Sequence, residues 1–307
     1  MSRAEEFRSR IQGVWTALIT PYDAGGNVSL QGTEQHVDFQ ISQNIDAIVP
    51  ASTMGEFPLL SEEERSAVLG TAIRAAQGRC LVIANITAND IRETIRLGVD
   101  ARNKGADGVI IMLPPFFALD EDEQFDYFQG IMKSVKLPAV IYSSENVASS
   151  LLSLPLLDRL VGLDNVCGIK EAIRSAERVC ELASSFGNRL PVIAAAEMAL
   201  PDVVSFGIRA TLTASSCFAP ILCRSLMEAA RTGYPDTNIA EAFYPIRLFR
   251  NLFQNEVDRG FPRYIPWTKA ACEWVGLQAG PPRKPIAGLR DWERERLRAV
   301  LPNILVG

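Results

Sequence analysis

Eight short apolar runs, separated by helix-length amphipathic stretches, constrain the fold more than any other feature of this sequence. Their continuous apolarity and β-branched residues are typical of parallel strands covered on both faces. A repeated strand–helix unit predicts a parallel sheet, and eight units within about 215 residues predict closure into a (β/α)8 TIM barrel, an α/β fold. The runs cover residues 14–20, 47–50, 80–85, 108–112, 139–142, 166–170, 192–195 and 210–213.

An open, doubly wound sheet is the competing architecture. Such a sheet usually carries a Gly-x-Gly-x-x-Gly or P-loop motif for a nucleotide, and the sequence contains neither. After the last apolar run the pattern becomes helical, over residues 221–231, 240–254, 267–275 and 291–301. The sequence therefore predicts a catalytic barrel over residues 1–219 and a C-terminal helical region over 220–307.

Composition excludes several classes of function. The 307 residues are 48% hydrophobic and 22% charged with a net charge of −5, which is ordinary for a globular protein and gives no reason to expect a nucleic acid partner. The single histidine, His36, excludes a metal site built on several imidazoles, and its neighbours predict a helix surface. The six cysteines form no Cys-x-x-Cys pair, so most are expected to be small buried hydrophobes.

The sequence also gives no sign of a membrane or secretory protein. The charged opening residues are not followed by an apolar signal segment, and no apolar run reaches the roughly 18 residues that a membrane-spanning helix needs. We therefore expect a cytoplasmic enzyme or binding protein with no membrane partner.

One lysine stands out from the other five. Lys170 ends an apolar strand, whereas the remaining lysines lie in helical or loop contexts that predict solvated charges. The C-terminal ends of barrel strands open at the face where active sites lie, and Gly168, on the same strand face, is expected to leave space below the lysine. Burial would lower the lysine pKa and favour the neutral amine, which attacks a ketone to form a Schiff base. A lysine paired with a carboxylate at the barrel mouth is the alternative.

Two further strand ends converge on the same mouth. Tyr142 ends the preceding strand, where a phenol can carry protons during imine formation; an aromatic residue that only lines the rim is the alternative. Ser52-Thr53-Met54-Gly55-Glu56 follows the second strand, and its backbone amides can face an anion such as a carboxylate. A simple strand–helix turn explains it equally well, and Glu56 is expected to be a structural hydrogen-bond acceptor.

Six motifs in the correct order resemble the dihydrodipicolinate synthase/N-acetylneuraminate lyase family of Schiff-base-forming aldolases and dehydratases. The resemblance extends over nearly the whole chain. The motifs are Gly13-Val14-Trp15-Thr16-Ala17-Leu18-Ile19-Thr20-Pro21-Tyr22, the turn at Ser52–Glu56 for Gly-Thr-Thr-Gly-Glu, Leu113-Pro114-Pro115-Phe116-Phe117 for Pro-Tyr-Tyr, Tyr142 for Tyr-Asn-x-Pro, Gly168-Ile169-Lys170-Glu171, and Ala279-Gly280-Pro281-Pro282-Arg283.

The resemblance implies a role for each matching residue. Lys170 forms the imine with a small-molecule 2-oxo acid substrate such as pyruvate, and Tyr142 relays protons. The backbone of Thr53 and Met54 holds the carboxylate, and the Thr53 hydroxyl bonds Tyr142. The family also implies a lyase that works as a homotetramer with no metal or organic cofactor. Substrate contacts beyond these are expected from loops and strand ends near Phe117, Ser143, Leu212 and Ser215.

Departures from the family motifs limit the substrate. The second threonine of the turn is Met54, and the tyrosine that completes the synthase relay is Phe117. Tyr-Asn-x-Pro is replaced by Tyr142-Ser143-Ser144-Glu145, and the arginine five residues after the tyrosine is Val147. These changes disfavour dihydrodipicolinate synthase itself.

Two alternatives stay open for the chemistry. The stretch that contains Glu145 and Asn146, together with Ser215 and Ser216, resembles the branch that dehydrates 5-dehydro-4-deoxyglucarate, and a 2-keto-3-deoxy sugar-acid aldolase fits almost as well. A different class, a 2-oxo acid sensor or catalytically altered paralogue, is motivated by Phe117.

Overall fold

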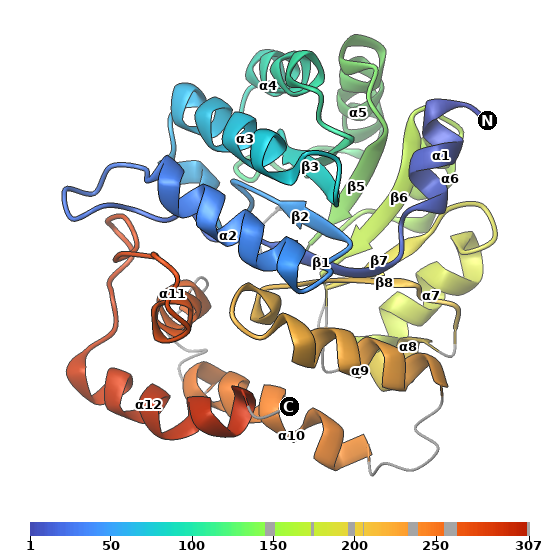
Figure 1. The fold of residues 1–307 in the computed structure, drawn as a ribbon. Coiled ribbons are helices and arrows are strands. Elements are labelled where there is room, and N and C mark those ends of the chain that lie inside the picture. Colours follow the sequence, from blue (N-terminus) through green and yellow to red (C-terminus); the bar gives the residue numbers. More distant parts are fainter. Residues whose placement is uncertain are drawn as a thin grey trace. The chain divides into compact units, whose positions relative to one another are not determined.

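The eight predicted strands form a closed barrel, in which they follow one another in sequence order (Figure 1). The computed structural model describes residues 1–144, 151–172, 175–195, 200–204, 206–232, 239–254 and 263–305. The predicted TIM barrel is therefore confirmed, and each strand lies within a few residues of its expected position. The strands are β1 (Gly13–Ala17), β2 (Ala47–Val49), β3 (Leu81–Asn85), β4 (Gly108–Ile111), β5 (Ala139–Ser143), β6 (Val166–Glu171), β7 (Val192–Ala194) and β8 (Ala210–Thr213).

Helices lie between the strands and after the last of them. The C-terminal helices begin and end within four residues of the limits predicted from sequence. The α-helices are α1 (Arg3–Ser9), α2 (Leu30–Ser42), α3 (Glu62–Ala76), α4 (Ile91–Lys104), α5 (Glu121–Val135), α6 (Leu154–Val161), α7 (Ala176–Phe186), α8 (Leu200–Val204), α9 (Pro220–Thr232), α10 (Ile239–Gln254), α11 (Tyr264–Trp274) and α12 (Asp291–Leu305), and the short 3-10 helices are η1 (Phe57–Leu59) and η3 (Ser215–Cys217).

The chain divides into two compact units. Unit 1 comprises Met1–Gly13 and Leu81–Leu212, and unit 2 comprises Val14–Cys80 and Thr213–Gly307. The helical region after residue 220 thus groups with the first two strands and their helices. The predicted division into a catalytic barrel over residues 1–219 and a C-terminal helical region over 220–307 stays a prediction.

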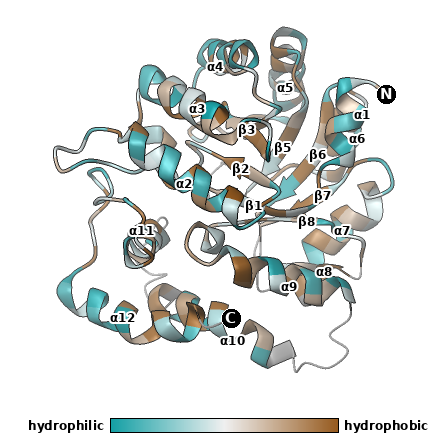
Figure 2. Cartoon of the chain, viewed as in Figure 1, coloured by the Kyte–Doolittle hydropathy of each residue, from teal (hydrophilic) through white to brown (hydrophobic). Residues whose placement is uncertain are grey.

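Unit 1 contains the strands from β3 onward and the helices between them. Its strands are buried along their length and are mostly hydrophobic in Figure 2, although part of β6 is hydrophilic, and α4 and α5 carry hydrophilic residues on part of their surface. Adjacent strands pair in parallel, which aligns their C-terminal ends. This alignment brings the residues that end β5 and β6 beside one another.

The N-terminal segment of unit 1 occupies the place of two missing side chains. A Cβ at Gly108 would lie 2.7 Å from the Phe7 ring, and a Cβ at Gly168 would lie 3.0 Å from Ile11 Cδ1. The prediction that Gly168 leaves space below the lysine is therefore wrong, because Ile11 fills that space. Glycine at these positions lets the segment pack closely on β4 and β6.

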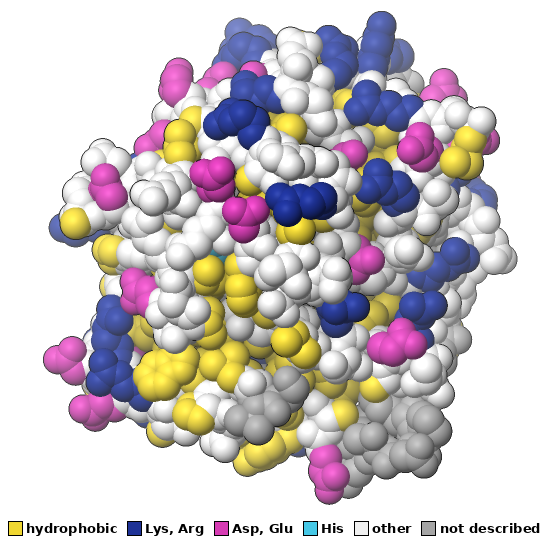
Figure 3. Space-filling model, in the orientation of Figure 1, with side chains coloured by type: hydrophobic (Ala, Val, Ile, Leu, Met, Phe, Trp, Pro, Cys, Tyr) yellow, Lys and Arg dark blue, Asp and Glu magenta, His cyan; other side chains and the backbone are white. Residues whose placement is uncertain are grey.

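Unit 2 combines β1 and β2 with α2, α3 and the helices after residue 220. Helices α2 and α3 lie side by side, as do α10 and α12 (Figure 1). Hydrophobic side chains gather over α10 and α12 in Figure 3, and the large exposed ones on these helices are Tyr244 and Trp292. No helix in the described ranges is long and apolar enough to cross a membrane.

The histidine prediction is wrong, whereas the cysteine prediction is confirmed. His36 is fully buried on α2, and its Nε2 lies 2.8 Å from the carbonyl oxygen of Gln278. Burial lowers its pKa to about 4. The segment that contains Gln278 covers the face of α2 that the local sequence presents as a surface. All cysteines except Cys180 are buried, and all are free thiols.

Candidate active site

Lys170 and Tyr142 occupy opposite positions on neighbouring strands of unit 1. Their Cα atoms are register partners between β5 and β6. The Nζ atom of Lys170 lies 3.3 Å from the centroid of the Tyr142 ring, and both residues are less than 10% exposed. Because β5 and β6 are parallel, residues in register share a strand face. The two side chains that sequence analysis selected are therefore in contact.

The surroundings of Lys170 favour its neutral form. Burial lowers the pKa of the amine below its ordinary value, while the neighbouring Tyr142 and Glu171 act in the opposite direction. An ammonium loses more solvation free energy on burial than an amine does. A lysine in this position is closer to the nucleophilic state than a solvated lysine.

Glu171 is directed to a different partner from Lys170. It is fully buried, and its Oε2 lies 3.7 Å from Nε of Arg178 on α7. Arg178 also donates to the carbonyl oxygen of Leu152 at 2.6 Å and to Glu181 at 2.6 Å. The Arg178 guanidinium therefore compensates the charge of Glu171, the residue that directly follows Lys170.

The turn after β2 in unit 2 presents a row of backbone donors. In the described part of the chain, the amides of Thr53, Met54 and Gly55 donate to no acceptor. The turn closes through bonds from Glu56 N to Thr53 O and from Phe57 N to Ser52 O, both 3.2 Å long. Successive amides left available by a turn form an anion-binding concavity.

A second buried lysine, which sequence analysis treated as solvated, holds this turn. Lys269 on α11 is buried, and its Nζ donates to Oε1 of Glu56 at 2.9 Å. Glu56 Oε2 accepts the backbone amide of Arg283 at 2.7 Å. Glu56 is thus a structural acceptor, as predicted, but its lysine partner was missed. The signal in the sequence is a lone charge between Trp267 and Ala270-Ala271-Cys272, which is an apolar helical stretch.

The other residues predicted to contact substrate lie in varied environments. Phe117 is 63% exposed between β4 and α5, and its ring meets Phe116 edge-on at 5.0 Å. Ser143 is buried and aligns with Glu171, one position along from the Tyr142–Lys170 pair. Leu212 is buried on β8, and Ser215 is buried at the start of η3 with its amide donating to Thr213 Oγ1.

Some of the predicted residues cannot be placed. Glu145, Asn146 and Val147 lie outside the described residues. Within the described ranges, no group of three or more His, Cys, Asp or Glu side chains is arranged to hold a metal ion.

Known proteins of similar sequence span nearly the whole chain. The 4-hydroxy-tetrahydrodipicolinate synthase of Bartonella bacilliformis is 27% identical over 294 residues, which cover 95% of this chain and 98% of the relative. An uncharacterized DapA-like lyase of Halobacterium salinarum is 27% identical over 296 residues, or 96% of this chain and 94% of the relative.

Solved structures show the same fold. The dihydrodipicolinate synthase of Acinetobacter baumannii, solved with pyruvate, has a TM-score of 0.88 and 25% identity, covering 96% of this chain and 99% of that one. The 4-hydroxy-tetrahydrodipicolinate synthase of Methylacidiphilum fumariolicum has a TM-score of 0.86 and 27% identity, covering 96% of both chains.

Fold, lysine and relatives together define a lyase of class I, which works through a Schiff base. The model of the dihydrodipicolinate synthetase family matches residues 10–304. The chain belongs to this family.

Proposed function

We propose that this lyase acts on a small 2-oxo acid of the 2-keto-3-deoxy sugar-acid type, by aldol cleavage or dehydration, with Lys170 as the imine-forming residue. The observation that carries the proposal is the contact between buried Lys170 and Tyr142. The A. baumannii relative was solved with pyruvate, a 2-oxo acid.

The chemistry begins with attack of the neutral Lys170 amine on the substrate C2 carbonyl. The C2–oxygen double bond becomes a carbinolamine, which loses its hydroxyl as water when a proton is supplied, and a protonated imine remains. We assign the delivery and recovery of these protons to Tyr142, because its ring contacts the lysine amine. The imine accepts the electron pair released when the C3–C4 bond breaks, or when a C3 proton leaves before a C4 hydroxyl is expelled.

The carboxylate of the substrate is assigned to the turn after β2. The free amides of Thr53, Met54 and Gly55 support this assignment, because they supply donors without adding a charged side chain. Contacts farther along the substrate are assigned to Phe117, Ser143, Leu212 and Ser215. Met54, Phe117 and Val147 stand where the synthase motifs carry polar groups, which disfavours dihydrodipicolinate synthase activity.

Borohydride trapping tests the proposal directly. Pyruvate and borohydride should add the mass of the reduced adduct to the peptide that contains Lys170 and leave the Lys269 peptide unmodified. Lys269 is a useful internal control, because it is also buried but engaged in an ion pair. Folded protein without an adduct at Lys170 would contradict the assignment.

A 2-oxo acid binding protein without turnover is the second candidate, favoured by Phe117, which lacks the hydroxyl of the family tyrosine. Both candidates form the imine, but only an enzyme converts substrate. A panel of 2-keto-3-deoxy sugar acids, followed by product analysis, separates cleavage from dehydration. Measurable turnover of any member excludes the binding protein.

We further propose a cytoplasmic homotetramer that needs no metal or organic cofactor. The free thiols fit a reducing compartment, and exposed Phe116 and Phe117 offer apolar surface for a second copy. Light scattering should give four times the chain mass, activity should survive dialysis against EDTA, and cell fractionation should recover the protein with the cytoplasm. A monomer would contradict the assembly.

A further inference from the structure

The turn after β2 bends through backbone conformations that L-residues rarely adopt. Ala51 has φ of 47° and Glu56 has φ of 58°, so left-handed residues flank the free amides of Thr53 to Gly55. Such conformations cost free energy and persist only where the surrounding structure holds them. Gly55 contributes by its size, because a Cβ there would lie 2.9 Å from Ala51 Cα.

Lys269 is the residue that holds the end of the turn. Its ammonium donates to Glu56 Oε1 at 2.9 Å and to the carbonyl oxygen of Thr20 at 2.8 Å, and it lies 4.0 Å from the centroid of the Tyr22 ring. Each of these contacts favours a cation. Burial lowers the pKa of Lys269, while the Glu56 carboxylate acts in the opposite direction.

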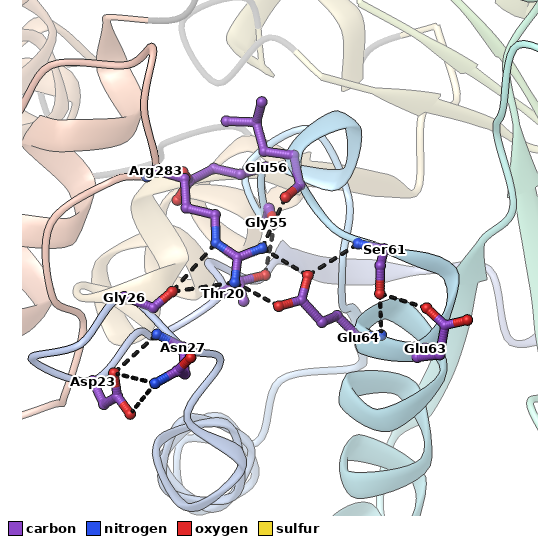
Figure 4. Close-up of polar contacts among 11 residues, drawn as sticks. Thr20, Asp23, Gly26, Asn27, Gly55, Glu56, Ser61, Glu63, Glu64 and Arg283 are labelled. Atoms are coloured by element: carbon purple, nitrogen blue, oxygen red, sulfur yellow. Dashed lines mark hydrogen bonds and ion pairs between the residues drawn. The ribbon is translucent and has the colours of Figure 1, made fainter.

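Thr20 links the lysine to the turn by a second route. Its hydroxyl donates to the carbonyl oxygen of Gly55 at 2.7 Å (Figure 4). Its own carbonyl oxygen accepts from Lys269. Lys269 thus bonds the side chain of Glu56 directly, and it reaches the carbonyl oxygen of Gly55 through Thr20. Three of the five turn residues are not involved in these bonds.

Arg283 completes the anchor from the closing Gly-Pro-Pro-Arg motif. Its backbone amide donates to Glu56 Oε2, while its guanidinium donates to Leu59 O at 2.8 Å and to Glu64 Oε2 at 2.7 Å (Figure 4). Glu64 also accepts the amide of Ser61 in the capping box of α3. The segment that follows the turn is therefore fixed at several points.

We propose that Lys269 is a positioning residue, whose ion pair with Glu56 fixes the backbone of Thr53–Gly55 so that its amides can hold the carboxylate of the 2-oxo acid. This inference rests on the proposed function, because it assigns the carboxylate to this turn. Lys269 acts through Glu56 and touches no reacting atom.

The double variant Glu56→Gln/Lys269→Met tests the inference. Removal of both charges avoids a buried ion without a partner, which would unfold many proteins. We expect the pyruvate concentration that half-saturates trapping at Lys170 to rise about tenfold, the equivalent of one lost charged contact. Trapping at saturating pyruvate should stay complete, because Lys170 is intact.

Hydrogen–deuterium exchange of the peptide over residues 52–57 gives a readout independent of pyruvate. Within this peptide, the amides of Glu56 and Phe57 close the turn through hydrogen bonds. They should exchange faster in the double variant than in Lys133→Met, a control that removes an exposed lysine on α5. Glu56→Gln alone is the second variant. Glutamine keeps one acceptor oxygen but places its NH2 group against the other donor, so one hydrogen bond is lost, and we expect a rise of about threefold. If only one of the two variants folds, its half-saturating pyruvate concentration and its exchange rate decide whether Lys269 positions the turn.

The outcomes separate the two proposals. Wild-type protein without an adduct at Lys170 contradicts the proposed function, whereas exchange data still decide whether the ion pair fixes the turn. A folded variant with wild-type half-saturation and wild-type exchange overturns the positioning role. Faster exchange with unchanged half-saturation also overturns it, because the turn would then not be holding the carboxylate.

Discussion

The Nζ atom of Lys170 lies 3.3 Å from the centre of the Tyr142 ring, within a parallel strand pair whose register places the two residues opposite each other. The contact pairs the candidate nucleophile with the group assigned to move its protons. The two roles can be tested separately. Loss of the Lys170 amine should abolish imine formation, whereas loss of the Tyr142 hydroxyl should slow proton transfer.

Replacement of Tyr142 by phenylalanine should slow proton transfer and spare the fold. We expect the exchange of pyruvate methyl protons with D2O, followed by NMR, to slow roughly 10²–10³-fold, the usual contribution of a positioned acid–base group. Tyr244→Phe is the matched control, because Tyr244 is exposed on α10. An unchanged rate in Tyr142→Phe would assign proton transfer to another group.

Replacement of Lys170 by methionine should abolish trapping and stabilise the protein. Because the pKa of Lys170 is lowered in the folded state, the unfolded chain binds the proton more strongly, and wild-type stability rises with pH between the folded pKa and the ordinary lysine value. The variant should therefore gain about 0.5–2 kcal/mol near neutral pH.

The stability gain of Lys170→Met should shrink as the pH approaches the ordinary lysine pKa. There the unfolded chain also loses the proton, so burial of the amine no longer costs the wild type free energy. Urea unfolding at a series of pH values measures the difference, with Lys133→Met as the exposed control. A gain that does not vary with pH would show that packing, and not charge burial, separates the two proteins.

Replacement of Gly55 by alanine should disturb the turn through a direct clash. The new Cβ would lie 2.9 Å from Ala51 Cα and 3.0 Å from Thr20 Oγ1. We expect a loss of about 1–3 kcal/mol in unfolding free energy together with weaker pyruvate binding. Calorimetry gives the first quantity and titrated trapping the second.

The control for that variant is Gly130→Ala on α5, where the nearest atom to a Cβ is Ile91 Cδ1 at 3.5 Å. A helical glycine replaced by alanine should gain up to about 1 kcal/mol. Similar behaviour of the two variants would mean that the turn can relax around a methyl group.

Replacement of Arg178 by methionine should destabilise unit 1 by leaving the buried carboxylate of Glu171 without this cation. We expect a loss of about 2–3 kcal/mol, less than for a fully buried pair because the Arg178 side chain keeps 15% exposure. The double variant Glu171→Gln/Arg178→Met should recover most of the loss in urea unfolding. Equal stability of the single variant and the wild type would show that the pair contributes nothing.

The barrel could be predicted from sequence because the strands of a parallel sheet covered on both faces are mostly apolar. That pattern is local, so each strand could be found within a few residues. Lys170 could be selected for the same reason, since a charge at the end of an apolar strand has few structural explanations.

Lys269 and His36 could not be predicted, because their burial depends on segments far away in sequence. Lys269 meets Glu56 across 213 residues, and His36 meets Gln278 across 242. Helical periodicity shows which face is apolar, but it does not show which polar residue a later segment will cover. The prediction of space at Gly168 was wrong for a similar reason, since Ile11, which fills that space, comes from the distant N-terminal segment.

The separation between Glu56 and Lys269 also has a consequence for biosynthesis. A ribosome that adds about 5–20 residues per second needs roughly 10–40 s to reach the lysine after the glutamate has emerged. During that interval the second strand and its turn exist without their cation, so a nascent chain carries an uncompensated carboxylate until α11 has been translated. If this turn holds the substrate carboxylate as proposed, binding of a 2-oxo acid should therefore appear only after α11 has been translated.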